Sequence, residues 1–249
     1  MAASELWVCN LEAIGYREAL VLQERVRAAR QAELIPDTLL LLEHRPAVYT
    51  RGRRSAPGEL SMGEAWYAER GIEIIDTDRG GKVTYHGPGQ LVGYPIVRVE
   101  DVVAYVRLLE RTLVEALSRI GVSARARDEE GPDYTGVWVQ ERKIASIGVH
   151  VARGVTTHGF AVNVEAQALI PFGWIVACGL PDVTMTSVES ELGQDSVTVS
   201  DFRELAAASL AAALGHERRP LGRDQLEDAL LTAPAAGPVE TALGSTAPR

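Results

Sequence analysis

The stretch from Arg79 to Gln90 constrains the fold of this chain more than any other feature, because it concentrates glycines and polar side chains between two apolar segments. Gly80 and Gly81 allow backbone conformations that other residues avoid, and a Gly-Pro-Gly turn closes the stretch. The flanking residues 72–76 and 91–97 are rich in β-branched and apolar side chains, which predicts buried strands. The stretch is therefore either a functional loop on rigid strands or a tight hairpin that caps the end of a barrel.

Chain length and composition predict a soluble globular protein. A chain of 249 residues with 46% hydrophobic residues can bury a core in one large domain or two small ones. The longest uncharged segment, residues 166–181, is too short to span a membrane and contains Pro171 and Gly173. No basic start followed by an apolar run opens the chain, so we expect a cytoplasmic protein.

The charge pattern favours a protein partner over nucleic acid or a membrane. The formal net charge of −9 argues against a general affinity for either polyanion. The sign reverses locally at Arg45, Arg51, Arg53 and Arg54, a density that suits an acidic partner or a phosphate group, or else an ordinary solvated loop. Two cysteines cannot build a disulfide framework, and no Cys or His pair has zinc-finger spacing, so we expect no metal site.

Hydrophobic periodicity alternates between helical and extended patterns along the chain. Helices are predicted over residues 16–34, 100–120 and 201–214, and Ser61 is expected to cap a short helix that runs to residue 68. Strands are predicted over residues 6–10, 38–43, 72–76, 91–97, 122–126, 135–140, 143–152 and 155–164. This order predicts an α/β (α+β) fold, a single domain over residues 1–215 with a mixed β-sheet flanked by helices. Residues 216–249 turn to Ala, Pro, Gly and Thr and are expected to form a disordered tail.

The strand pair within residues 143–164 can be aligned from its turn. If residues 153–154 form a two-residue hairpin turn, Gly148 faces Gly159 and Ser146 faces Ala161. Small residues that face one another leave a shallow trough, which suits close approach by a ligand or another backbone, or else relieves crowding against a helix.

Cys178 is the candidate nucleophile, provided that an activating group lies beside it. It follows an apolar run and precedes Gly179, as a thiol at the edge of a strand or turn would, although an inert core cysteine has similar surroundings. Because a free thiol is mostly protonated at neutral pH, nucleophilic work needs a partner that withdraws the proton. The sequence alone does not choose among the candidates, which are Lys143, His86, His150 and His158.

Several separate stretches together resemble one family, the octanoyltransferases of lipoate synthesis, also called lipoyl(octanoyl) transferases. The segment from Arg79 to Gln90 is similar to the family signature, with Lys82 where Gln or another polar residue is usual. Residues 143–148, 158–164 and 178–179 resemble the remaining blocks in order and approximate spacing. Residues 43–50 are similar to the N-terminal block, although Arg51 stands where an apolar residue is more usual. The resemblance covers roughly residues 5–215.

The resemblance implies octanoyl transfer through Cys178 and Lys143. In this family the cysteine takes an octanoyl group from acyl carrier protein as a thioester and passes it to a lysine of a lipoyl domain, in a 2-oxoacid dehydrogenase complex or in the glycine cleavage H protein. The implied fold is that of the biotin and lipoate protein ligase catalytic core, and no nucleotide, metal or other cofactor is implied. The implied lining of the acyl and thioester site is Arg79, Gly80, Gly81, Lys82, Val83, Thr84, Tyr85, His86, Ser146, Ile147, Gly148, Gly159, Phe160 and Ala161.

Two other classes of function stay open. An ATP-dependent lipoate or biotin protein ligase would share the fold but would need no nucleophilic cysteine, and an acyl-binding module without chemistry would have the trough and an idle thiol. A dinucleotide site is weaker, because Val92 stands where the glycine fingerprint needs a third glycine. No Gly-x-Ser-x-Gly motif of a serine hydrolase is present.

Overall fold

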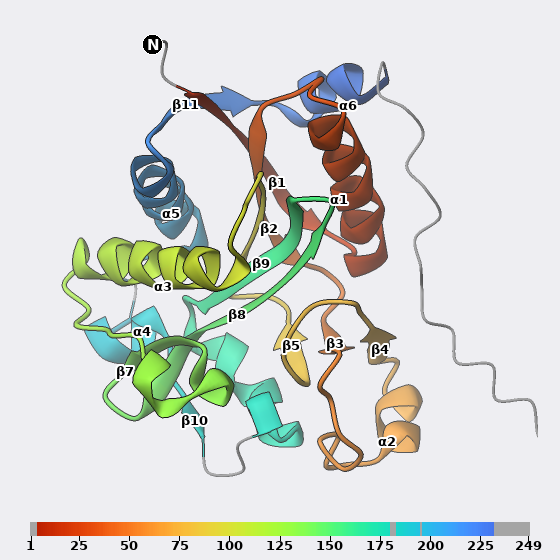
Figure 1. Cartoon of the computed structure of the whole chain (residues 1–249). Helices are drawn as coiled ribbons and strands as arrows, with labels where there is room; N and C mark the ends of the chain where they lie inside the picture. Colours follow the sequence, from red (N-terminus) through yellow and green to blue (C-terminus); the bar gives the residue numbers. More distant parts are fainter. Residues whose placement is uncertain (1–3, 180–182, 195, 232–249) are drawn as a thin grey trace, which may run out of the picture.

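The computed structural model describes residues 4–179, 183–194 and 196–231, and in this part of the chain eight strands form one mixed sheet (Figure 1). The strand order is β10-β8-β9-β6-β2-β1-β11, with β7 paired to β8. β1 is parallel to β2 and β11, whereas β2, β6, β9 and β8 pair antiparallel in that order. The strands are β1 (Ser4–Ile14), β2 (Asp37–His44), β6 (Gln90–Ile96), β7 (Gly136–Val139), β8 (Arg142–Ala152), β9 (Val155–Asn163), β10 (Thr184–Met185) and β11 (His216–Leu221). The expected mixed sheet is confirmed.

Helices cover both faces of this sheet, which explains the uninterrupted leucines of β2. α3 (Val102–Ser118) and α5 (Val199–Leu214) lie on one face, and α1 (Tyr16–Gln31) and α6 (Arg223–Leu231) lie on the other (Figure 1). Successive side chains of a strand point to opposite faces. Leu39 and Leu41 therefore pack under α3 and α5, whereas Leu40 and Leu42 pack under α1. Burial on both faces thus accounts for the four successive leucines in the middle of β2.

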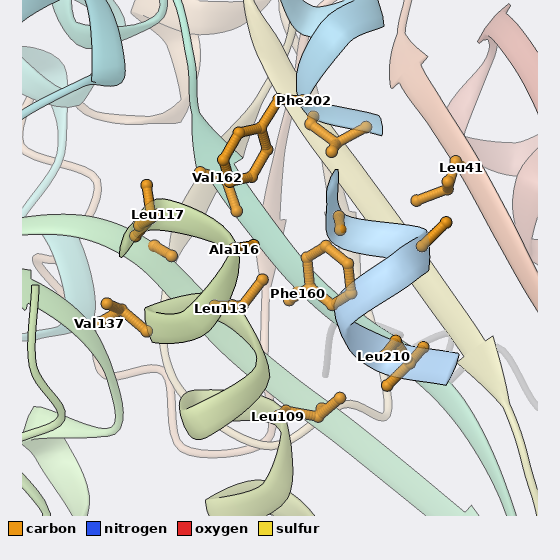
Figure 2. Close-up of a cluster of buried hydrophobic side chains, with 14 of the residues drawn as sticks. Leu41, Leu109, Leu113, Ala116, Leu117, Val137, Phe160, Val162, Phe202 and Leu210 are labelled. Carbon is orange, nitrogen blue, oxygen red and sulfur yellow. The ribbon is translucent and has the colours of Figure 1, made fainter. Parts of the chain in front are cut away.

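The larger core lies between the sheet and the pair formed by α3 and α5. Figure 2 shows Leu109, Leu113 and Leu117 of α3 and Phe202 of α5 gathered around Phe160 of β9. Burial of each such side chain contributes about 1.5–3 kcal/mol, so this cluster fixes α3 firmly on the sheet. The position of α3 matters below, because its first turn forms part of the mouth of a cavity.

A small second sheet contains part of the glycine-rich stretch. Its order is β4-β3-β5, from β3 (Val48–Arg51), β4 (Glu73–Asp76) and β5 (Thr84–His86), and α2 (Glu64–Glu69) lies beside it. The stretch expected to be a loop therefore includes a short strand. The remaining elements are α4 (Val188–Leu192) and the 3-10 helices η1 (Asp128–Glu130), η2 (Pro132–Tyr134), η3 (Ala166–Trp174) and η4 (Ala177–Gly179).

Three local predictions are wrong. α2 begins after Gly63 without a side-chain cap, so Ser61 does not cap it. α5 begins two residues earlier than expected, because Thr198 caps it and Asp201 completes the capping box from inside the first turn. Residues 122–126 form no strand but contribute a single bridge between Arg125 and Trp138.

The expected domain end at residue 215 is also wrong. β11 extends the main sheet by pairing with β1, and α6 then packs beside α1 (Figure 1). Leu221, Leu226 and Leu230 are buried in the core on that face. The sequence of β11 lacks the alternating apolar pattern that predicts a strand, because five of its six side chains are half-buried or exposed at the sheet edge. The rest of the expected tail, residues 232–249, lies outside the described residues.

None of the described helices has both the length and the apolar character needed to cross a lipid bilayer.

Candidate active site

A cavity of about 340 Å³ opens where the glycine-rich stretch crosses β8 and β9. The residues that line the cavity differ in solvent exposure. Arg53 and Val103 lie exposed at the mouth, whereas Tyr94 and His158 are buried inside. The expected site residues that line it are Arg79, Gly80, Gly81, Lys82, Val83, Thr84, His86, Lys143, Ser146, Ile147, Gly148, Gly159, Phe160 and Ala161. The structure thus brings together residues from three distant parts of the sequence.

Tyr85 was expected in this lining, but the structure places it in a different cluster. It lies between Thr84 and His86 in β5, and both neighbours line the cavity. Alternation along the strand turns Tyr85 the other way. Its ring centroid lies 5.5 Å from that of Tyr49 and 5.6 Å from that of Phe172, inside the core of the small sheet. Tyr85 is therefore a core residue.

The predicted register of β8 and β9 is confirmed. Gly148 pairs with Gly159 and Ser146 pairs with Ala161. The turn residues Arg153 and Gly154 both have positive φ, 48° and 74°, as a type I′ hairpin requires.

Main chain fills most of the trough left by these small residues. A Cβ atom at Gly148 would lie 2.8 Å from the carbonyl oxygen of Gly80, and the Gly80 amide donates to the Val149 carbonyl at 3.0 Å. A Cβ atom at Gly159 would collide with the carbonyl oxygen of Gly93 in β6. Gly148 therefore lets the Gly80–Gly81 segment lie directly on the sheet, where it forms one wall of the cavity.

Arg79 shapes this segment from inside. Its buried guanidinium donates to Oγ1 of Thr50 at 2.7 Å, to the Thr50 carbonyl at 2.8 Å and to the Lys82 carbonyl at 2.8 Å. These bonds fix the loop to β3. Arg79 thus lines the cavity as expected, and it also holds together the glycine-rich stretch that forms the cavity wall.

Lys143 is fixed at the cavity wall with only 2% of its surface exposed. Its Nζ lies 5.2 Å from the centroid of the Trp138 ring. Gly136, which has φ 133°, leaves the room for this side chain, because a Cβ atom there would lie 2.7 Å from Cε of Lys143. The buried carboxylate of Glu110 accepts the Gly136 amide at 2.9 Å, so the strand that makes this room is itself anchored.

The backbone of Cys178 belongs to η4, and its side chain lies outside the described part of the structure. A Cβ atom at the next residue, Gly179, would collide with the side chain of Lys82, which lines the cavity. Glu59 ties η4 to the same wall, because its carbonyl accepts the Val176 amide and its carboxylate accepts the Val83 amide. The segment that carries Cys178 therefore lies against the cavity.

Two of the three candidate histidines, His86 and His158, line the cavity together with Lys143. Burial is the main cause that holds the pKa of His86 well below its ordinary value, and the charges of His44 and Arg79 lower it further. Nδ1 of His86 lies 2.8 Å from Oε1 of Gln90.

His158 pairs with Asp78. Its Nε2 lies 2.7 Å from Oδ1 of Asp78, and Nε2 of His150 lies 3.5 Å from the other oxygen. Burial alone would raise the pKa of Asp78, but the hydrogen bond from His158 and the charges of both histidines outweigh it and bring the pKa to about 2. Burial lowers the pKa of His158, so its ring is neutral at pH 7.

The sequence reading missed the contribution of other elements to the lining. Tyr16 of α1 and Tyr94 of β6 reach the buried end, and Val102 and Val103 of α3 reach the mouth. The sequence carried no local signal for the valines, because Val103 fits the three- and four-residue spacing of the core face of α3 and yet is 67% exposed. In the described residues no group of three or more His, Cys, Asp or Glu side chains could hold a metal ion.

Comparison with known proteins places the chain in a family. Residues 15–211 match the lipoyl protein ligase A/B catalytic domain. An octanoyltransferase of Rhodococcus jostii (strain RHA1) is 41% identical over 248 residues, which cover 96% of this chain and 92% of that protein. An octanoyltransferase of Mycobacterium tuberculosis (strain ATCC 25618 / H37Rv) is 45% identical over 217 residues, which cover 85% of this chain and 88% of that protein.

Solved structures support the same fold. A crystal structure of lipoate-protein ligase A bound with ATP superposes with a TM-score of 0.71 at 17% identity, covering 91% of this chain and 93% of that chain. From the match over residues 15–211 and the identity to curated relatives over most of the chain, this protein belongs to the octanoyltransferases of the lipoyl protein ligase A/B catalytic-domain family.

Proposed function

We propose that this protein transfers an octanoyl group from octanoyl-acyl carrier protein, through a thioester on Cys178, to a lysine of a lipoyl domain. Its membership of the octanoyltransferases supports the acyl group and the reaction class. The observation that carries the proposal is the position of Lys143, a buried lysine fixed at the wall of the cavity against which the Cys178 segment lies.

Lys143 serves as the proton carrier in both halves of this reaction. First the amine withdraws the thiol proton of Cys178, and the thiolate attacks the carbonyl carbon of the donor thioester. The new C–S bond forms, the bond to the carrier sulfur breaks, and Lys143 returns the proton to the leaving thiolate. In the second half the lysine amine of the lipoyl domain attacks the enzyme thioester, Cys178 leaves as a thiolate, and Lys143 takes the amine proton. Thioester exchange is nearly isoenergetic and amide formation is downhill, so no nucleotide is consumed.

The walls of the cavity suit a fatty acyl chain. Val83, Ile147 and Phe160 line it together with Val92 and Ala161. Its volume of about 340 Å³ falls in the range of small-molecule sites. Each methylene group removed from water contributes about 0.8 kcal/mol, so an octanoyl chain gains most of its binding free energy from these contacts.

The arginines at the mouth support an acidic carrier protein as donor. Within the cluster between Arg45 and Arg54, only Arg53 and Arg54 line the cavity. Arg51 is bound in ion pairs with Glu64 at 2.6 Å and Asp76 at 2.7 Å. Arg54 has an ion pair with Asp133 at 3.2 Å, so we assign the contact with the carrier mainly to Arg53. The lipoyl domains of 2-oxoacid dehydrogenase complexes and of the glycine cleavage H protein are the proposed acceptors, and the cytoplasmic location stays a prediction.

Intact-mass spectrometry after mixing with octanoyl-acyl carrier protein tests the proposal. The wild-type protein should gain the mass of one octanoyl group, Cys178→Ala should gain none, and Lys143→Ala should gain it slowly or not at all. Cys9→Ala is the matched control, because Cys9 is fully buried in β1 and burial raises its pKa to about 11. It should acylate like the wild type.

Three outcomes would contradict parts of this mechanism. An adduct on Cys178→Ala would exclude the thioester at that residue. An unimpaired Lys143→Ala would move the activating role to a histidine that lines the cavity, with His86 the first candidate. Product formation from free octanoate and ATP, but not from the carrier thioester, would identify a ligase.

A further inference from the structure

The buried end of the cavity contains polar atoms that a saturated acyl chain would not need. Thr84 is 7% exposed and His158 is 3% exposed, and both line the cavity. Oγ1 of Thr84 and Nδ1 of His158 are buried without a hydrogen-bond partner among the described residues. A buried polar atom left unpaired costs about 1–3 kcal/mol, so each requires an explanation.

The hydrogen bond of His158 determines which of its nitrogens can bind a ligand. Nε2 faces the carboxylate of Asp78 at 2.7 Å. An ionised carboxylate can only accept, so Nε2 carries the ring proton. Because the buried ring is neutral, Nδ1 keeps a lone pair and acts as an acceptor. The cavity thus offers an acceptor at His158 and a hydroxyl, which both donates and accepts, at Thr84.

These atoms lie far from the reacting lysine. Nζ of Lys143 lies beside Gly136, which pairs with Ser146 of β8, and His158 pairs with Val149, three residues or about 10 Å farther along that strand, close to the length of an extended octanoyl chain. Tyr16, whose ring stacks on that of His86 at 5.9 Å, closes the same buried region. An acyl chain with its carbonyl carbon beside Lys143 can therefore reach His158 with its far end.

We propose that Thr84 and His158 bind a hydroxyl group at the far end of the acyl chain, so that medium-chain acyl thioesters with a terminal hydroxyl are substrates alongside the saturated octanoyl thioester. This inference rests on the proposed function and names a substrate class for it. The terminal hydroxyl donates to Nδ1 of His158 and accepts from Oγ1 of Thr84, so each partner satisfies a different part of it. In a cavity with an apolar end the same hydroxyl would be buried unpaired, at a cost of about 1–3 kcal/mol.

The test compares kcat/KM for ω-hydroxyoctanoyl and octanoyl thioesters of acyl carrier protein on the same enzyme preparation. For the wild type the two values should agree within about threefold, since the hydroxyl finds partners. Thr84→Val, which keeps the shape and removes the hydroxyl, should lower the ratio of hydroxylated to saturated substrate about tenfold. Because each ratio is measured on one protein, a change in the folded fraction cancels.

Thr157→Val is the matched control. Thr157 is 2% exposed, precedes His158 in β9 and also has a buried Oγ1 without a described partner, but it does not line the cavity. Its ratio should equal that of the wild type. A wild-type preference for the saturated chain of tenfold or more, or equal ratios in Thr84→Val and Thr157→Val, would overturn the inference.

Failure of the proposed function would look different, because neither thioester would then acylate the protein. In that case calorimetric Kd values for free ω-hydroxyoctanoate and octanoate, measured with the same variants, decide the inference by the same comparison of ratios.

Discussion

A side chain at position 136 would occupy the space that Lys143 fills. The Cβ atom of an alanine at Gly136 would lie 2.7 Å from Cε and 3.4 Å from Nζ of Lys143. It would also collide with the Ala145 carbonyl, and φ at this position is 133°, which L side chains rarely adopt. The placement of the proposed proton carrier thus depends on a glycine in a neighbouring strand.

Gly136→Ala should therefore slow octanoyl transfer to Cys178 by at least about tenfold, because a displacement of about 1 Å in a catalytic group costs rates of this order. Backbone strain should also lower the melting temperature. The rate of adduct formation, followed by mass spectrometry at a temperature where the variant is folded, measures the first effect. Gly121→Ala controls for strain, because Gly121 has φ 85° but open space around it. Equal rates for the two variants would show that Gly136 does not position Lys143.

Leu226→Ala tests whether the C-terminal helix belongs to the folded unit. Leu226 is fully buried in the core beneath α1, so its truncation should lower the free energy of unfolding by about 2–5 kcal/mol. Leu231→Ala, five residues later, should have almost no effect because Leu231 is 77% exposed. Urea denaturation measures both. If Leu226→Ala were as stable as Leu231→Ala, α6 would not be packed in solution.

Stability should fall as the pH drops from 6.5 towards 4, because of a buried histidine. Burial lowers the pKa of His44 from 6.5 to about 4, so the native state binds fewer protons than the unfolded chain in this window. A group whose pKa is lower in the native state than in the unfolded chain contributes its full share to the free energy of unfolding above its unfolded pKa. This contribution is lost as the pH falls towards the native pKa. The loss assigned to His44 between pH 7 and pH 4 is about 3 kcal/mol.

Denaturation of the wild type and of His44→Gln at both pH values measures this effect. The variant is expected to be less stable at pH 7, because Nε2 of His44 lies 2.7 Å from the Tyr94 hydroxyl. It should lose less stability on acidification, since it lacks the titrating ring. Identical losses in the two proteins would assign the acid sensitivity to other groups.

Arg53→Glu should raise the KM for octanoyl-acyl carrier protein about tenfold and leave that for a small octanoyl thioester unchanged, because opposite charges steer and hold a protein partner. Arg53 is exposed at the mouth and has no ion pair with a described residue. Arg111→Glu makes the same charge change on an exposed position of α3 away from the cavity and should change neither KM. If Arg53→Glu raised the KM for both donors equally, Arg53 would have no role in docking the carrier protein.

The sequence predicted best where local rules determine the geometry. The turn at Arg153 and Gly154 set the register of β8 and β9, and with it the pairing of Gly148 with Gly159. Most of the predicted site residues do line one cavity, because they lie on a few strands that the fold brings together. Tyr85 was misplaced because the glycine-rich stretch was read as a loop, in which side chains do not alternate, whereas β5 is a strand.

Features that depend on contacts between distant parts of the sequence could not be predicted from local sequence patterns. Tyr16 and Tyr94 reach the cavity only because α1 and β6 pack around it, and nothing in their own neighbourhoods indicates this. β11 was missed for a related reason: its pairing with β1 across two hundred residues supplies the order that its charged sequence does not predict.

One wall of the cavity is peptide backbone, the Gly80–Gly81 segment bonded to Val149 and pressed against Gly148. Amino-acid replacement changes side chains and leaves such a surface almost untouched. Adapting this scaffold to bulkier acyl groups, by natural divergence or in the laboratory, must therefore work through the parts of the lining made of side chains, such as Val102, Val103 and Val106 of α3.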